Sequence, residues 1–548
     1  MIEFIRKHLD IFTILGLLVA FYFLFFHNIW AYPLMDVDET RYVAMSRDMF
    51  QTKDFLTLYL NGDFFFEKPP LYFWLESLSF WIFHTVSEFS ARIPMALYAT
   101  SSCFLLYFVG KKIVSRSFGV VSSLILATSV EFLVLSKIAI LDMLLAACVA
   151  FSIFFGFMTF FVAEQNKKYF WWLFYAFSGL SVLAKGVPGV AIPFGTMFFA
   201  GLVSKKIKEF LNPQYFWVGI GLFLAIALPW HLIMFKMHDP LFFNEYIMKH
   251  HLSRFVDSKD LGRQQPWYYF VLMLLWGLIP WISSFVAMIA ENLKKLNIEF
   301  LKNFDFAKLD NTQKFLTLNI IAFLFILMFF SSSSTKLMTY ILPIYPFTAV
   351  IMAWYWSEYL FENKHKKPIA ISVYILNSIL ILASIAAAIS WLFLPINLSA
   401  DIADAKWFLV GLLSIVPLAG IFCVKKDKKI GVFASYVAFI LILSAFGTHR
   451  IFNVDYKFGQ NDLMEYAKIA KDNHYELSTF KFGRRYSLLY YYEGRVEFQQ
   501  EEDYVWLNDT LDKPYSVVII KNKDLETIKQ NTSFNVIKTG RKYTLIKR

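Results

Sequence analysis

The stretch LDIFTILGLLVAFYFLFFHNIWA, residues 9–31, decides the fold class, because it is long and apolar enough to cross a lipid bilayer. A hydrocarbon core about 30 Å thick requires roughly 20 apolar residues of helix. No small-residue cleavage site follows the stretch, which predicts a retained membrane span and not a removed signal peptide. The whole 548-residue chain has the same character, since 57% of it is hydrophobic and only 17% is charged.

Similar stretches recur along the chain and predict an all-α polytopic membrane protein with about thirteen transmembrane helices. Soluble domains carry about 25% charged residues, so most of this chain must be solvated by lipid. The candidate spans lie at about 9–31, 93–113, 117–134, 140–162, 169–184, 187–203, 214–234, 267–291, 314–332, 337–357, 370–394, 406–424 and 430–448.

The distribution of lysine and arginine predicts the orientation of these spans. If Arg6 and Lys7 lie inside, every second connection is also inside and is basic, as in the cluster at 425–429, whereas the outer connections carry few cations. Basic loops remain on the inner side of a membrane. The formal net charge of +11 therefore reflects topology and not nucleic-acid binding. Two long outer connections, 32–92 and 235–266, offer material for a functional site.

The composition divides the chain into a transmembrane domain, residues 1–449, and a small outer α/β domain, residues 450–548. In the second region the patterns predict helices and strands. The helices are expected at 461–472 and 525–530, and the strands at 515–521, 534–539 and 542–547. The Arg484–Arg485 pair and the tyrosines at 490–492 could touch lipid headgroups, or could form a solvated face and a strand edge.

Acidic residues are clustered where the first span meets the outer surface. Asp36, Asp38 and Glu39 follow that span within a few residues. Asp38 could simply cap a surface helix that extends to about Phe50. Carboxylates at this depth, however, commonly face a cavity or a partner. Asp142 opens another span at its outer end, where an acid costs free energy unless it is paired, hydrated or caps the helix.

Several cations and one tyrosine are expected on the same outer face. They are Lys68 before two prolines, Lys185 in a two-residue turn, Arg254 in the second long loop, and Lys336 and Tyr340 in a hydroxyl-rich segment between two spans. Each alone has an ordinary explanation, such as a helix C-cap or a side chain that snorkels toward headgroups. Together with the carboxylates they indicate a site for a phosphate-linked donor, because cations stabilise a phosphate leaving group and a carboxylate orients or deprotonates a nucleophile.

The order of these motifs resembles a known family. The first outer loop reads Asp38–Glu39–Thr40–Arg41–Tyr42, then Asn61–Gly62, then Phe66–Glu67–Lys68–Pro69–Pro70. This pattern resembles the first periplasmic loop of the aminoarabinose lipid A transferases, which belong to the polyprenyl-phosphate-dependent membrane glycosyltransferases together with the protein O-mannosyltransferases. Further landmarks are Leu141–Asp142–Met143, Leu183–Ala184–Lys185–Gly186, His251–Leu252–Ser253–Arg254–Phe255, Pro266–Trp267–Tyr268–Tyr269, Pro280–Trp281, Lys336–Leu337 and Thr339–Tyr340–Ile341–Leu342–Pro343.

The resemblance implies a GT-C fold and an inverting transfer from undecaprenyl phosphate, at the periplasmic face of a bacterial inner membrane. The sugar would be 4-amino-4-deoxy-L-arabinose or a related one, and the acceptor lipid A or another envelope molecule. By the same resemblance, Asp38 is the principal catalytic acid, Asp142 a second acid, and Lys68 lies over the carrier phosphate. Glu67 and His251 match a pair that holds a divalent metal ion such as zinc; no other cofactor is expected. We expect a monomer that contacts membrane lipids and no nucleic acid.

Two alternatives remain open on the sequence alone. One is transfer of a sugar, such as mannose, from a polyprenyl phosphate to protein hydroxyls or to a cell-wall glycan. The other is a lipid transporter or flippase. A transporter favours internal repeats, broken spans and charges near the bilayer midplane. The sequence has no evident repeat, and its charges gather at the outer interface, so the transferase hypotheses are favoured.

Overall fold

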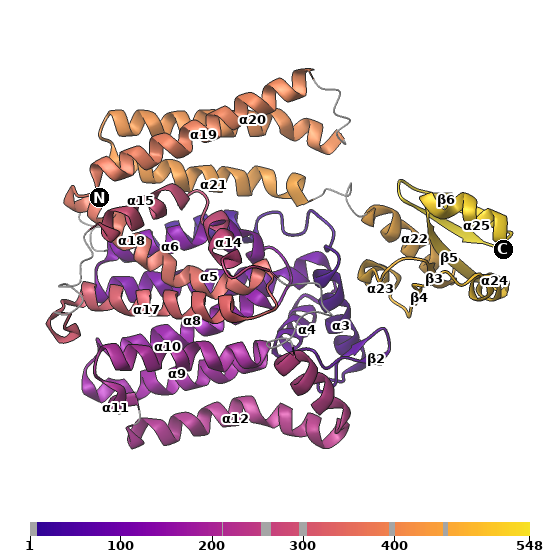
Figure 1. The fold of residues 1–548 in the computed structure, drawn as a ribbon, viewed down its shortest axis with the longest axis horizontal. Coiled ribbons are helices and arrows are strands. Elements are labelled where there is room, and N and C mark those ends of the chain that lie inside the picture. The colour runs from indigo at the N-terminus through magenta and orange to yellow at the C-terminus, as the bar shows by residue number, and fades with distance from the viewer. Residues whose placement is uncertain (1–7, 211, 254–264, 295–303, 394–399, 453–458) are drawn as a thin grey trace.

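The computed structural model describes residues 8–210, 212–253, 265–294, 304–393, 400–452 and 459–548. Long helices lie side by side in a bundle, and a small domain built on a β-sheet stands at one end of it (Figure 1). The chain is therefore a multi-pass membrane protein with a small C-terminal sheet domain, as the sequence predicts.

Eight helical segments of the described chain are long and apolar enough to cross a membrane. They correspond to eight of the thirteen predicted spans. They are α2 with η1 (Leu9–Phe21 and Tyr22–Phe26), α5 (Glu88–Ile113), α12 (Pro213–His238), α17 (Asn311–Ser332), η5 with α18 (Met338–Ile344 and Tyr345–Glu362), α19 (Lys366–Phe393), α20 (Ala400–Lys425) and α21 (Lys429–Phe452).

The other predicted spans are shorter, more polar or interrupted. Helices α6 (Arg116–Ala127) and α7 (Val130–Ser136) meet at a bend of 69° and make a ninth span if they are counted together. Pro280 separates α14 (Tyr269–Gly277) from α15 (Ile282–Leu293). Helices α8 (Asp142–Met158) and α10 (Val187–Val203) have 17 residues each, and α9 (Glu164–Lys185) begins with a polar turn. Within the described residues, eight or nine of the thirteen predicted spans thus have the length and composition of a membrane crossing.

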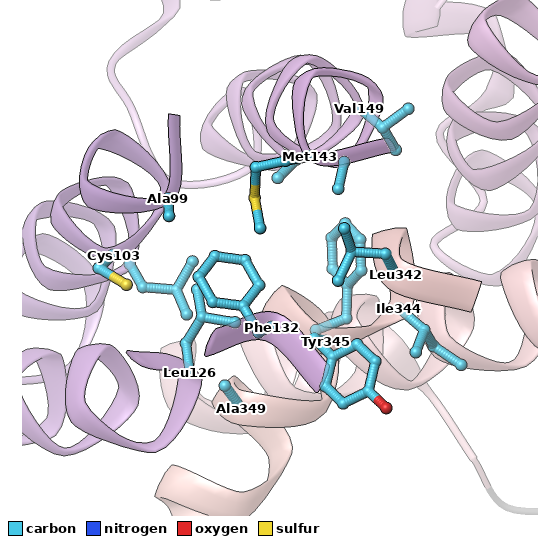
Figure 2. Close-up of a cluster of buried hydrophobic side chains, with 14 of the residues drawn as sticks. Ala99, Cys103, Leu126, Phe132, Met143, Val149, Leu342, Ile344, Tyr345 and Ala349 are labelled. Carbon is cyan, nitrogen blue, oxygen red and sulfur yellow. The ribbon is translucent and has the colours of Figure 1, made fainter. Parts of the chain in front are cut away.

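The core of the bundle surrounds α8, which is buried along almost its whole length. A helix that is hydrophobic on all sides belongs inside a larger assembly of helices. Figure 2 shows how side chains of α5, α6, α7, α8, η5 and α18 converge there. The labelled residues are Ala99, Cys103, Leu126, Phe132, Met143, Val149, Leu342, Ile344, Tyr345 and Ala349. This packing holds the start of α8, and with it Asp142, in a fixed position.

The first long loop folds into a helix, a hairpin and a second helix. Helix α3 (Asp38–Thr52) confirms the helix predicted to extend to about Phe50, and α4 (Leu71–Phe83) begins directly after two prolines. Between them, β1 (Tyr59–Leu60) pairs with β2 (Asp63–Phe64). The two-residue turn is Asn61–Gly62, with φ values of 57° and 88°. Such left-handed pairs favour the tight hairpin turn, for which Asn-Gly is the preferred sequence.

The remaining short elements lie in connections. They are α11 (Ile207–Phe210), η2 (Phe243–Ser253) and η4 (Phe306–Lys308). The second long loop, which contains η2, contacts the first: Nε2 of His238 lies 3.2 Å from the Thr57 hydroxyl, and the rings of Phe66 and Phe242 meet edge to face. The two long loops are therefore neighbours in space.

The C-terminal domain is a five-stranded mixed sheet with helices. Its elements are α22 (Gln460–Asp472), β3 (Glu476–Phe480), α23 (Tyr486–Tyr492), β4 (Glu497–Gln499), α24 (Tyr504–Asp512), β5 (Ser516–Lys521), η6 (Asn522–Asp524), α25 (Leu525–Asn531), β6 (Asn535–Thr539) and β7 (Tyr543–Lys547). The strand order is β4-β3-β5-β7-β6. Strand β3 pairs in parallel with β4 and β5, and β7 pairs antiparallel with β5 and β6. The five elements predicted from the sequence are confirmed, whereas β3, α23, β4 and α24 are additional to that prediction.

The tyrosine run at 490–492 belongs to a helix and not to a strand edge. This helix, α23, packs on α3. Arg47 of α3 donates hydrogen bonds to the carbonyl oxygens of Leu489 and Tyr490, at 3.2 and 2.8 Å. Asp36 accepts from the backbone N–H and the hydroxyl of Ser487, at 2.7 and 2.6 Å. The first loop and the C-terminal domain are thus joined by polar contacts that are wholly or partly buried.

Candidate active site

Asp38 is the first residue of α3. Its carboxylate is hydrogen-bonded to a side chain and not to the backbone N–H groups at the start of the helix. It makes no capping hydrogen bond, and the residue before the helix is Val37. One oxygen accepts from Nη2 of Arg41 at 2.8 Å. The side chain of Asp38 is 52% exposed, and no described residue donates to its other oxygen. The interpretation of Asp38 as a mere helix cap is therefore wrong.

Arg41 connects two acids of the first loop, Asp38 and Glu67. Its guanidinium bonds Asp38 and also lies 4.0 Å from the carboxylate of Glu67. The guanidinium is held over the rings of Tyr42, Phe65 and Tyr486, at 4.9, 5.8 and 5.8 Å from their centroids. Because this side chain is only 15% exposed, water screens its positive charge very little. Arg41 belongs to the sequence motif of the loop, but it is not among the predicted site residues.

Glu67 and Lys68 occupy the segment between the hairpin and α4. The Lys68 ammonium donates to the carbonyl oxygen of Glu67 at 3.2 Å, so the lysine side chain folds back onto its own segment. Both residues are half-buried. The structure therefore brings Glu67 beside the Asp38–Arg41 pair, with Lys68 next to it in the chain.

Tyr42 links this group to Asp142. Burial raises the pKa of the Tyr42 phenol, Arg41 opposes that shift, and the carboxylates of Asp38, Asp142 and Glu67 raise it further. Charges affect a neighbouring pKa only over short distances. All three carboxylates, which belong to three separate segments of the chain, thus lie near enough to this phenol to raise its pKa.

Asp142 forms a second part of the site with the end of α9. Its carboxylate accepts from the Lys185 ammonium, which also lies 4.3 Å from the centroid of the Tyr340 ring in η5. The side chains of Asp142 and Lys185 are 11% and 12% exposed. The helix ends there because Gly186 adopts a φ of 74°. Lys185 is thus a cation at the C-terminal end of a helix, as predicted, and it also pairs with an acid.

The other predicted site residues have different environments. Lys336 is buried and donates to the carbonyl oxygen of Ser333, and burial lowers the pKa of its ammonium. No hydrogen bond or ion pair in the described chain joins it to Asp142 or Lys185. Arg254 and the side chain of His251 lie outside the described residues. The described residues contain no group of three or more His, Cys, Asp or Glu side chains placed to hold a metal ion.

A buried pair that the sequence did not predict fixes the start of α3. Arg92 of α5 binds both oxygens of Glu39, at 2.7 and 2.9 Å. The other oxygen lone pairs of Glu39 accept from the backbone of Met35 and Ala139, at 2.7 and 2.8 Å. The carbonyl oxygens of residues 29, 32 and 33 complete the arginine's bonds. Glu39 is therefore a structural acid that holds the adjacent Asp38 against the bundle.

Other proteins share the region that holds these residues. Residues 10–243, which contain Asp38, Glu67, Lys68, Asp142 and Lys185, match the family described as dolichyl-phosphate-mannose-protein mannosyltransferase. An uncharacterized protein of Aquifex aeolicus is 30% identical over 341 residues, which is 62% of this chain and 72% of that protein.

A named relative and a solved structure point in the same direction. The undecaprenyl phosphate-alpha-4-amino-4-deoxy-L-arabinose arabinosyl transferase of Yersinia enterocolitica is 25% identical over 344 residues, 61% of this chain but only 58% of that enzyme. The crystal structure of ArnT from Cupriavidus metallidurans bound to undecaprenyl phosphate superimposes with a TM-score of 0.75, 16% identity and 98% coverage of both chains. Sequence and fold together show that the chain is a membrane glycosyltransferase with the GT-C fold of ArnT, and that its residues 10–243 match the protein mannosyltransferase family.

Proposed function

We propose that this protein transfers 4-amino-4-deoxy-L-arabinose or a related sugar from undecaprenyl phosphate to lipid A or another envelope acceptor. The observation that carries the proposal is that Arg41 binds Asp38 and lies 4.0 Å from Glu67, while Lys185 pairs with Asp142. Carboxylates and cations in one partly buried site suit a donor whose leaving group is a phosphate. The named Yersinia relative and the undecaprenyl phosphate in the ArnT structure support this choice of donor.

The proposed reaction exchanges one bond for another at the anomeric carbon. An acceptor oxygen attacks that carbon, and the bond from the carbon to the carrier phosphate oxygen breaks. The polyprenyl phosphate leaves with the electron pair, and the configuration of the sugar inverts. Lys185 and Lys68 stabilise the negative charge that develops on the departing phosphate. Lys336, Tyr340 and Arg254 are proposed as further contacts to the donor.

The role of Asp38 depends on the acceptor. A phosphate monoester is already an anionic nucleophile, so Asp38 would only position the reacting groups. A hydroxyl acceptor must lose a proton, and Asp38 would then take it as a general base. One oxygen of Asp38 is bonded to Arg41, and the other is available to a ligand on the exposed side of the residue. The second oxygen suits either role.

The predicted zinc site remains a proposal. Glu67 would be one ligand and His251 the other, and a cation there would add positive charge beside the donor phosphate. The described residues supply only Glu67, which already lies 4.0 Å from the Arg41 guanidinium. If the site exists, elemental analysis of the purified protein will find a bound divalent ion that is lost in Glu67→Ala; the absence of any such ion removes the proposal.

The proposed location is a bacterial inner membrane, with the site and the C-terminal domain in the periplasm and the protein acting as a monomer. The basic connections of the sequence support this orientation. The first loop and the C-terminal domain share one end of the bundle, as that orientation requires (Figure 1).

A second candidate is transfer to protein hydroxyls or to a cell-wall glycan. The match of residues 10–243 to the mannosyltransferase family favours it, because that match covers the candidate active site. The two proposals differ in the acceptor, and therefore in which cellular molecule changes mass.

Mass spectrometry of lipid A and of envelope glycans, from cells with and without this protein, tests the choice. We expect lipid A to gain the mass of one aminopentose only in cells that contain the active protein. An Asp38→Asn strain with equal protein levels is the control. Unchanged lipid A together with an altered glycan or protein would favour the second candidate instead.

A further inference from the structure

A cavity of about 650 Å³ lies between the hairpin of the first loop and the C-terminal domain. Its walls are the β1–β2 turn on one side and β3, α23 and β4 on the other. Ligand sites in proteins typically measure about 300–1,000 Å³. The cavity is therefore large enough for one or two sugar rings. Asp38, Glu67, Lys68, Asp142 and Lys185 are not among its lining residues, so it is a separate space from the site described above.

The hairpin is attached to the C-terminal domain at the edge of this cavity. The Asn61 side chain donates to the carbonyl oxygen of Val496 at 2.8 Å and accepts from its N–H at 2.9 Å. It thus binds the chain beside β4 in the way that a neighbouring strand would. A methyl group added to Gly62 would lie 3.8 Å from the Arg495 guanidinium, so that guanidinium rests against the turn.

Two arginines of the cavity have guanidinium groups without a polar partner among the described residues. Arg484 and Arg495 are both exposed, and neither forms an ion pair or a side-chain hydrogen bond with any residue that the structure describes. A guanidinium presents a planar fork of donors that matches a phosphate group. Two such groups in one cavity provide anchoring points for an anionic ligand.

Two tyrosines also line the cavity, and one of them connects it to the candidate active site. The ring of Tyr486 faces the Arg41 guanidinium at 5.8 Å. Tyr492 has its hydroxyl bonded to the carbonyl oxygen of Tyr475 at 2.7 Å. Tyrosine offers an apolar face and a polar tip, which suits the mixed surface of a sugar ring. Because Arg41 also binds Asp38, a ligand against Tyr486 would be close to the reacting groups.

The remaining polar lining favours a saccharide over an acyl chain. Asp63, Glu476 and Glu497 contribute exposed carboxylates, which accept hydrogen bonds from sugar hydroxyl groups. Burying an acyl chain among two guanidinium groups and three carboxylates would cost free energy.

We propose that this cavity binds the phosphorylated saccharide head group of a lipid-anchored acceptor. Arg484 and Arg495 hold the phosphate, the tyrosines pack against the sugar, and the acyl chains stay in the membrane. The inference rests on the proposed function, because it assigns the acceptor of the same site. It also gives the C-terminal domain a role, which is to select the acceptor.

Binding measured directly on the full-length protein in nanodiscs tests this proposal independently of turnover. The probe is bisphosphorylated lipid A, compared with fully dephosphorylated lipid A and with phosphatidylglycerol. We expect Arg484→Ala/Arg495→Ala to weaken binding of the bisphosphorylated probe about tenfold or more. The matched control is Arg541→Ala, which removes an exposed arginine of the same domain outside the cavity.

The outcomes of this experiment separate the two proposals. Equal binding by wild type and the double variant overturns the cavity assignment, and so does equal binding of lipid A with and without phosphate. Strong competition by phosphatidylglycerol would also overturn it, because any lipid phosphate would then suffice. Loss of binding in the double variant, combined with no sugar transfer by the wild type to lipid A or to any other envelope molecule, would retain the cavity but refute the proposed function.

Discussion

Asp38 and Glu39 are adjacent in the sequence but have opposite environments. Asp38 is 52% exposed and is bonded to Arg41, whereas the Glu39 side chain is 1% exposed and is enclosed by Arg92 and backbone N–H groups. A buried and fully bonded acid serves the fold, while an exposed acid with an available oxygen can serve a ligand. This contrast predicts different results for two conservative substitutions.

Asp38→Asn is expected to reduce the transfer rate at least about a hundredfold, the lower end of what a positioned acid or base contributes. Folding should be unaffected, because no described backbone group depends on this carboxylate. The measurement is sugar transfer by purified protein together with its thermal unfolding temperature. Asp48→Asn is a matched control, since Asp48 is on the same helix and also binds an arginine, Arg47, at 2.8 Å. Near-normal activity of Asp38→Asn would refute the catalytic assignment.

Glu39→Gln is expected to lower stability as well as activity. The change leaves the Arg92 guanidinium, which is fully buried, without its counter-charge. Breaking a buried ion pair on one side costs about 3–5 kcal/mol. Thermal unfolding in detergent should therefore shift to a clearly lower temperature, unlike that of Asp38→Asn. If Glu39→Gln were inactive but as stable as the wild type, Glu39 would have to act on the substrate directly.

Sequence reasoning locates part of the candidate site at the level of single residues. Asp38, Asp142 and Lys185 are predictable because charged residues at the edge of a membrane span need partners, and two of them prove to be each other's partner. Arg92 escapes prediction because it lies in an apolar span, 53 residues from Glu39. Arg41 escapes prediction as a site residue because its neighbours Phe65 and Tyr486 come from distant parts of the chain.

At the scale of elements, the site depends on how α8 and α9 meet. Asp142 begins α8 and Lys185 ends α9, so the ion pair joins the start of one helix to the end of the next. The positive end of the α8 dipole also favours the carboxylate, and the negative end of the α9 dipole favours the ammonium. The pair therefore both fastens two helices and places a cation beside Tyr340.

A double-mutant cycle separates these two roles. Asp142→Asn and Lys185→Gln, taken singly, should each destabilise the protein by about 3 kcal/mol, because each leaves one nearly buried charge unpaired. The combined variant should recover much of that stability. Transfer should stay at least about a hundredfold below that of the wild type in all three variants, because the cation proposed to bind the donor phosphate is lost or misplaced. Recovery of activity in the double variant would mean that the pair is only structural.

Element boundaries are predictable where one signal dominates. Continuous apolar runs locate the eight long spans, and the prolines at 69 and 70 locate the start of α4. Apolar length is less decisive for α8 and α10, which have 17 residues each, because helices packed inside a bundle are apolar too: α8 is almost wholly buried and α10 partly so. Helix α23 is absent from the prediction because its tyrosines suit a strand equally well, and its packing on α3 decides the outcome.

At the scale of the whole molecule, the C-terminal domain is attached to the face that holds the candidate active site and not to a distant surface. Asp36, Arg47 and Asn61 of the first loop each bond to this domain, at Ser487, at the end of α23 and at Val496. The sequence predicts the domain and its side of the membrane but not these contacts, since they join residues more than 400 positions apart. Because the first loop is bonded to the domain, the candidate active site and the proposed acceptor cavity lie on one connected surface.

The proposed orientation predicts which surfaces are accessible from outside the cell. The α20–α21 turn is at the opposite end of the bundle from the C-terminal domain (Figure 1). We therefore expect Lys529→Cys in that domain to react with a membrane-impermeant maleimide in intact spheroplasts, and Lys426→Cys in the turn to react only after permeabilisation. The natural cysteines suit this background, because Cys103 and Cys148 are buried, and Cys423 can be replaced by serine. Labelling of Lys426→Cys in intact spheroplasts, with Lys529→Cys protected, would reverse the orientation and place the candidate active site in the cytoplasm.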